Sequence, residues 1–190
     1  MQQPEIVTTE NPGKNAQTSL PAAVIAPALP LHTLSVLVNN KPGVLARIAQ
    51  VFARRGFNIE SLVVSPTMDG RFSRMTIGTR GDPVWFTQII SQANKLIDVI
   101  HCTDHTNEDA VVKELALIKV RATSATRGDI LQIIEHFKSK TVDLAEDSLV
   151  VQATGDSDKL DALVGMLLKF GILELVRTGK VVMSRGGKAT

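Results

Sequence analysis

The sequence contains no tyrosine and a single cysteine among its 190 residues, and aromatic residues make up only 4% of it. The lone thiol, Cys102, excludes an intramolecular disulfide framework and fits a reducing compartment, so we expect a cytoplasmic protein. No apolar run reaches the roughly 18 residues of a membrane-spanning helix, so no membrane partner is expected. The net charge of +2, with acids and bases interspersed, gives no electrostatic reason to expect nucleic acid.

Residues arranged for catalysis are also lacking. The sequence has no Gly-x-Ser-x-Gly elbow, no phosphate loop and no dinucleotide fingerprint. Cys102 lies in a predicted strand without a matched acid–base group, and no two carboxylates are placed as an acid and base pair. His101 and His105 are separated by about 13 Å on an extended segment, too far to share a metal ion. We therefore expect no catalytic residue, no metal and no cofactor on this chain.

Residues 1–31 form a separate zone, because five prolines interrupt it and polar residues fill the gaps. The first basic residue is Lys14, whereas a secretory signal needs a basic start and an unbroken apolar stretch. We predict a flexible tail, with docking of this tail on a partner as the alternative.

The remainder divides into two copies of one pattern. Within 32–106, strands are predicted at 32–38, 58–65, 72–79 and 97–103, with a helix over 43–55 and another opened by Gly81-Asp82-Pro83. Within 112–190, strands are predicted at 114–122, 142–145, 149–154, 172–177 and 181–184. Helices are expected to begin at a capping box, Thr126 to Asp129, and at Asp156. Two βαββαβ units predict an α+β fold of tandem ferredoxin-like domains, each a four-stranded antiparallel sheet under two helices.

The stretch from Asn39 to Leu62 organises the first copy. Asn39 and Asn40 can supply a capping acceptor, and Pro42 suits a first helical turn. Gly43 lets the backbone come close to a ligand, and Gly56 ends the helix. Asn58 then stands at the mouth of the next strand.

This arrangement favours a site for a small zwitterion. N–H groups at the helix start attract a carboxylate, and an Asn58 amide can orient a carboxylate or an ammonium group. Val44, Leu45 and Ile59 would line an aliphatic pocket. The alternative is that Gly43 and Asn58 only form turns and caps.

Three blocks carry a resemblance to a known family: Asn40 to Arg47, Arg54 to Leu62 and Ser73 to Thr76. They resemble an ACT domain, and more closely the small, regulatory subunit of acetohydroxyacid synthase (acetolactate synthase), with similarity from about 32 to 186. The resemblance implies a homodimer through the ACT domains, with valine held where the Gly43 turn of one chain meets the Asn58 region of the other. The matched positions are Asn40, Gly43, Val44, Leu45, Asn58 and Ile59. The second copy lacks the Pro-Gly entry and the Gly-x-Asn-Ile exit, so the site is expected only in the first.

The resemblance also implies a catalytic large subunit as partner, which would carry thiamine diphosphate, Mg²⁺ and FAD. This chain would activate that subunit and confer inhibition by valine in branched-chain amino acid biosynthesis. Two alternatives are an ACT module that serves another enzyme or a transcriptional regulator, and an RRM-like RNA-binding module, whose stacking aromatics are missing from 34–38. Arg74 is either an interface residue or a simple surface residue. Arg185-Gly186 also resembles the family pattern, but the sequence suggests no role for it.

Overall fold

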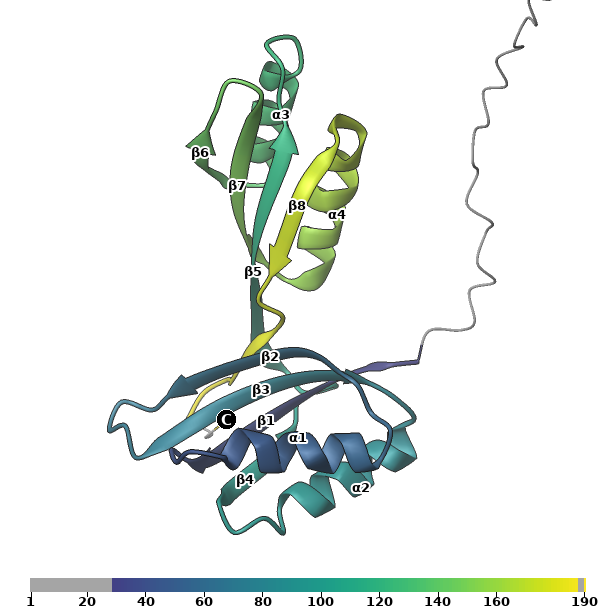
Figure 1. The fold of residues 1–190 in the computed structure, drawn as a ribbon, viewed down its shortest axis with the longest axis vertical. Coiled ribbons are helices and arrows are strands. Elements are labelled where there is room, and N and C mark those ends of the chain that lie inside the picture. The colour runs from purple at the N-terminus through teal and green to yellow at the C-terminus, as the bar shows by residue number, and fades with distance from the viewer. Residues whose placement is uncertain (1–28, 188–189) are drawn as a thin grey trace, which may run out of the picture.

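The computed structural model describes residues 29–187 and residue 190, and contains two βαββαβ units in succession (Figure 1). The tail predicted for 1–31 falls, up to residue 28, outside the described residues. The first unit consists of β1 (Leu31–Asn39), α1 (Val44–Arg54), β2 (Ile59–Pro66), β3 (Phe72–Arg80), α2 (Pro83–Ala93) and β4 (Val99–Asp104). Its strands form an antiparallel sheet in the order β2-β3-β1-β4.

The second unit repeats this plan and adds one strand. It consists of β5 (Ala110–Arg121), α3 (Arg127–His136), β6 (Lys140–Leu144), β7 (Ser148–Gly155), α4 (Ser157–Leu167), a 3₁₀ turn (Leu168–Phe170), β8 (Ile172–Arg177) and β9 (Val181–Ser184). The sheet order β6-β7-β5-β8 matches that of the first unit. The predicted fold class, two tandem ferredoxin-like units, is therefore confirmed.

Each sheet buries one face under its two helices. In the first unit the alternating residues Leu34, Val36 and Val38 of β1 meet the stripes of α1 and α2, which repeat at helical spacing. The second unit has a separate core, in which Ile118 of β5 lies among buried residues of α3 and α4. The two domains therefore bury their apolar surface independently, as the repeated pattern predicts.

β5 is longer than predicted, because it begins at Ala110 instead of residue 114. Its first four residues pair with β9, from Ala110 opposite Ser184 to Lys113 opposite Val181. Its remaining length is the central strand of the second sheet, between β7 and β8. Figure 1 shows β5 running from the first domain into the second, which stands on the side of the first sheet opposite α1 and α2.

Two predicted helix caps are wrong. The N-cap of α1 is Gly43 with no side-chain cap, and the Asn40 side chain instead donates to the Gly70 carbonyl at 3.0 Å. Thr126 makes no cap for α3, because its hydroxyl accepts the N–H of Thr123 at 3.1 Å. Asp82 and Asp156 do cap α2 and α4, as predicted.

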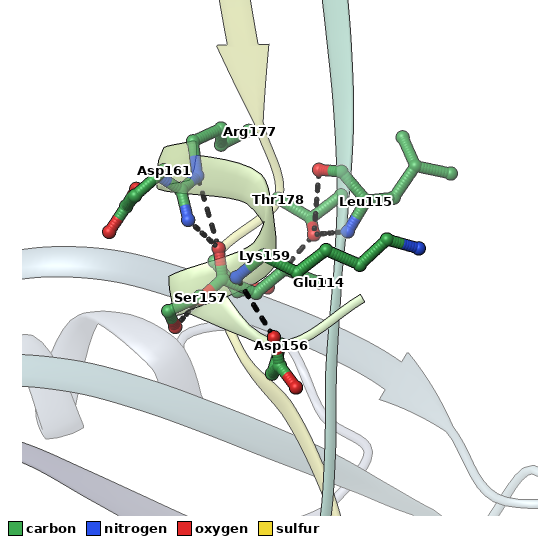
Figure 2. Close-up of polar contacts among 9 residues, drawn as sticks. Glu114, Leu115, Asp156, Ser157, Lys159, Asp161, Arg177 and Thr178 are labelled. Atoms are coloured by element: carbon green, nitrogen blue, oxygen red, sulfur yellow. Dashed lines mark hydrogen bonds and ion pairs between the residues drawn. The ribbon is translucent and has the colours of Figure 1, made fainter. Parts of the chain in front are cut away.

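A buried ion pair joins β5 to β8 close to the first domain (Figure 2). Glu114 is 6% exposed, and its Oε2 accepts from Arg177 Nη2 at 2.6 Å and Nε at 3.1 Å. Ser157 donates to the other oxygen of Glu114, and Arg177 also binds Asp161. Burial alone would lower the pKa of Arg177, but the hydrogen bonds to Asp161 and Glu114 outweigh it and raise that pKa, so the guanidinium stays charged.

We expect Arg177→Met to lower the free energy of unfolding by about 3 kcal/mol, because it leaves the Glu114 carboxylate buried without its cation. The matched control is Lys119→Met, which removes an exposed pair with Glu174 at 3.6 Å and is expected to cost less than about 1 kcal/mol. Urea unfolding of both variants measures the difference. Equal losses would show that the Glu114 pair has no special structural role.

Candidate functional site

Two backbone hydrogen bonds position the turn between β1 and α1. The N–H of Asn39 donates to Asp98 O at 2.8 Å, and that of Asn40 donates to Arg71 O at 2.9 Å. Gly43 has a φ of 81°, a conformation that side chains rarely adopt, while a Cβ at this position would meet nothing within 4 Å. Glycine is therefore required here by the backbone conformation, and the space above the turn is open.

The start of α1 differs chemically from those of α2 and α4. Those two helices begin at an aspartate whose carboxylate accepts a backbone N–H, whereas α1 has no side-chain cap and no acidic residue in its first turn. The nearby cation Arg47 lies 2.5 Å from the Asp98 carboxylate and is neutralised by it. The Val44 N–H donates to Lys41 O at 3.4 Å, so the next N–H groups, those of Leu45 and Ala46, and the positive end of the helix dipole favour an external carboxylate.

Asn58 provides a second polar group on this domain. It precedes β2, its side chain is exposed, and its backbone carbonyl accepts from Thr79 Oγ1 at 2.7 Å. The amide of Asn58 makes no hydrogen bond with any described residue. Its position is thus fixed by the backbone while its donor and acceptor point to solvent.

The turn and the amide lie at opposite ends of the sheet. Asn39, before the Gly43 turn, pairs with Phe72, whereas Ile59, after Asn58, pairs with Thr79. Seven residues of β3 separate these two positions, which corresponds to about 24 Å. A single chain therefore does not bring Gly43 and Asn58 together. β2 is an edge strand, and within the described residues no strand covers its outer side.

The three predicted aliphatic residues differ in exposure. Val44 is 2% exposed and belongs to the core, so it supports the turn from below. Leu45 is 40% exposed, and Ile59 is half-buried against the core. Leu45 and Ile59 are thus the two that present apolar surface, one at each half of the candidate site.

A contact with the second domain lies two residues from Ile59, and no pattern in the sequence indicated it. The register of β2 shifts between Ile59 and Ser61, which marks an irregularity in this strand. Ser61 packs against Gly179 in the turn between β8 and β9. A Cβ at Gly179 would lie 2.3 Å from the Ser61 Cβ. Only a residue without a side chain fits there.

Other chemistries find little support in the described residues. Burial, with the Asp104 charge adding to it, raises the pKa of the Cys102 thiol to about 12, so it is a poor nucleophile. Between residues 29 and 187 no three metal-ligating side chains gather, and no helix is long and apolar enough to cross a membrane. The sheet face that an RRM offers to RNA carries Thr33, Ser35 and Thr76 here, which are buried.

Comparisons with known proteins match both domains. Residues 34–101 match the family described as AHAS small subunit-like ACT domain, and residues 113–186 match the family described as small subunit of acetolactate synthase. A probable acetolactate synthase small subunit of Archaeoglobus fulgidus is 49% identical over 157 residues, covering 83% of this chain and 98% of the relative. The acetolactate synthase small subunit of Mycolicibacterium smegmatis is 48% identical, covering 83% of this chain and 92% of the relative.

A solved structure shares the whole arrangement. The crystal structure of the acetolactate synthase small subunit from Thermotoga maritima aligns with a TM-score of 0.74 at 38% sequence identity. The alignment covers 83% of this chain and 99% of that one. The similarity thus extends over both domains.

Proposed function

This chain belongs to the family of acetolactate synthase small subunits, and on that premise we propose that it is a regulatory subunit which binds valine. It performs no chemistry itself. It activates a catalytic large subunit, which holds thiamine diphosphate, Mg²⁺ and FAD and joins pyruvate to pyruvate or to 2-oxobutanoate. When valine is bound, the same chain transmits feedback inhibition to that subunit.

One observation supports this proposal most: the Gly43 turn and Asn58, the two half-sites, lie apart on a domain whose sheet has an open edge. Antiparallel pairing of β2 with β2 of a second copy continues the sheet across a two-fold axis. Such pairing places the start of the second copy's β2 beside the end of the first copy's β2. The Asn58 region of one chain then approaches the Gly43 turn of the other, and each dimer contains two equivalent sites.

The chemistry of the two half-sites is complementary to a free aliphatic amino acid. The N–H groups at the start of α1 bind the carboxylate, and the Asn58 amide accepts from the ammonium group or donates to the carboxylate. Leu45 and Ile59 contact the aliphatic side chain. Valine acts on the enzyme only to the extent that it binds one conformation of the complex better than another, typically by about 1–3 kcal/mol.

The alternative is that this ACT module serves a different enzyme. Titration of valine, leucine and isoleucine against acetolactate formation by the mixed large and small subunits tests the proposal directly. We expect activation by this chain and inhibition by valine. An inert mixture, together with recovery of another enzyme by this chain from its own cells, would support the alternative.

We expect Val64→Arg to weaken the dimer at least tenfold, because Val64 is 44% exposed on β2 and a cation there opposes pairing with a second copy. Val84→Arg is the matched control, since Val84 is 68% exposed on α2, away from the seam. Sedimentation velocity over a concentration series measures both. A Val64→Arg protein that sediments like the wild type would place the dimer interface elsewhere.

We expect Asn58→Ala to lower valine affinity by about 10- to 100-fold, the loss expected when a charged ligand group loses a hydrogen bond. Activation of the large subunit is expected to persist, because the Asn58 carbonyl that anchors β2 is retained. Asn94→Ala, at the exposed C-cap of α2, is the control. Undiminished inhibition of the reconstituted Asn58→Ala enzyme by valine would show that the site is misplaced.

We expect Gly43→Asp to abolish valine binding, since it puts a carboxylate beside the N–H groups that receive the carboxylate of the ligand. Gly43→Asn is the matched control, because it has the same size and the same left-handed backbone but no charge. Calorimetry with valine compares the two. Equal affinities would exclude a carboxylate site at this turn.

A further inference from the structure

An ion pair stands directly beside the start of α1. Asp98, between α2 and β4, holds the turn before this helix through its backbone, because its carbonyl accepts the N–H of Asn39 at 2.8 Å. Its carboxylate lies 2.5 Å from Nη2 of Arg47, which belongs to the first turn of α1. The Asp98 side chain is 10% exposed and that of Arg47 is 50% exposed. The pair is therefore anchored at the turn on one side and open to solvent on the other.

The geometry of α1 places Arg47 close to the N–H groups that the proposed function assigns to the ligand carboxylate. The N–H of Arg47 donates to Gly43 O at 3.2 Å, so Arg47 lies one helical turn after Gly43. Residues four apart on a helix share one face, with their Cβ positions about 5–6 Å from each other. Long helical side chains also lean back toward the N-terminus of their helix. A charge on Arg47 therefore acts at short range on an anion bound at the start of α1.

The other charged groups near this turn are exposed to solvent. Arg71 pairs with Asp69 at 2.8 Å, and their side chains are 76% and 42% exposed. Lys41, in the turn itself, is also exposed. Water and salt screen exposed charges of this kind. Of these groups, Asp98 is the one that the fold shields from water, and its charge is matched by Arg47.

This pairing bears on which ligands the turn accepts. A helix start attracts any carboxylate, whether or not the molecule also carries an ammonium group. An unpaired Arg47 would add a full positive charge to that attraction, so a simple carboxylate would bind without help from the other half-site. Because Asp98 cancels this charge, only the weaker attraction of the helix start remains. Binding then depends on the ammonium group as well, and on the Asn58 amide of the second chain.

We propose that the Arg47–Asp98 pair restricts this turn to zwitterionic amino acids, because it cancels a cation that would otherwise favour carboxylates without an ammonium group. Asp98 acts through Arg47, as a positioning residue that touches no ligand atom. The inference rests on the proposed valine site at the Gly43 turn. It goes further by assigning the discrimination between an amino acid and the anion of the same carbon skeleton to one carboxylate.

NMR titration of the full chain with two probes tests this assignment. The probes are valine and 3-methylbutanoate, which is valine without its ammonium group, and the measured quantity is the Kd of 3-methylbutanoate divided by that of valine. Asp98→Asn keeps the size of the side chain and the carbonyl that holds Asn39, but it leaves the charge of Arg47 uncancelled. We expect this variant to lower the ratio at least threefold, the effect of one charge about 7 Å away in water.

Two further variants and salt separate charge from structure. Arg47→Gln should raise the ratio, because it leaves a negative charge beside the turn, and combining it with Asp98→Asn should restore a value close to that of the wild type. About 0.5 M NaCl should shrink the effect of Asp98→Asn, since exposed charges are screened at that concentration. Glu174→Gln is the matched control, because it removes one negative charge from an ion pair with Lys119 in the second domain. It should leave the ratio unchanged.

The possible failures are distinguishable. A ratio that is unchanged in Asp98→Asn, or that falls equally in Glu174→Gln, would overturn the role of the pair and leave the valine site intact. A fall that persists in full at high salt would show that Asp98 acts through structure and not through charge, which would also overturn the inference. A wild-type chain that binds neither probe would instead contradict the proposed function on which the inference rests.

Discussion

The edge position of β2 is the constraint on which the proposed function depends. A sheet edge leaves a row of backbone donors and acceptors unpaired, which a second copy of the same edge can satisfy. The strand order also places the Gly43 turn and Asn58 about 24 Å apart in one chain. Under the proposed function, a complete ligand site therefore requires the dimer. In the proposal, a single chain holds two half-sites and no complete one.

The same strand is also the physical connection to the second domain. Ile59, the register shift and Ser61 follow each other along β2, and Ser61 packs against Gly179. The turn that carries Gly179 is fixed by Thr178, whose N–H donates to Leu115 O at 3.0 Å, and by the Glu114–Arg177 pair. If β2 pairs with a second copy as proposed, this contact links the proposed seam to the base of the second domain through backbone and a buried ion pair.

Local patterns in the sequence were enough to predict most of the fold. Alternation over residues 34–38 predicted β1, because one face of that strand is buried under helices. Asp82 and Asp156 marked two helix starts by a short-range hydrogen bond that the sequence alone specifies. The cap of α1 was missed because Asn40 is held by Gly70, thirty residues away.

Contacts between distant segments account for the other differences. The sequence indicated a strand at 181–184, but nothing in it showed that this strand would pair with the start of β5. The contact between Ser61 and Gly179 also joins residues far apart in the sequence, so no local pattern indicated it. Gly43 and Asn58 lie at a turn and at a strand mouth, as their residue types suggest. Their roles as a ligand site rest on family resemblance and on the open edge, because no local pattern distinguishes a binding glycine from a turn glycine.

The continuity of β5 limits how these domains can be rearranged. Most two-domain proteins have an exposed linker at which a protease cuts or a foreign module can be inserted. Here only His105 to Asp109 separate β4 from a strand that pairs first with β9 and then with the second sheet. A chimera in which one domain comes from a relative would therefore have to take β5 and β9 from the same protein. The two domains therefore cannot be exchanged separately at a simple linker, although each has its own core.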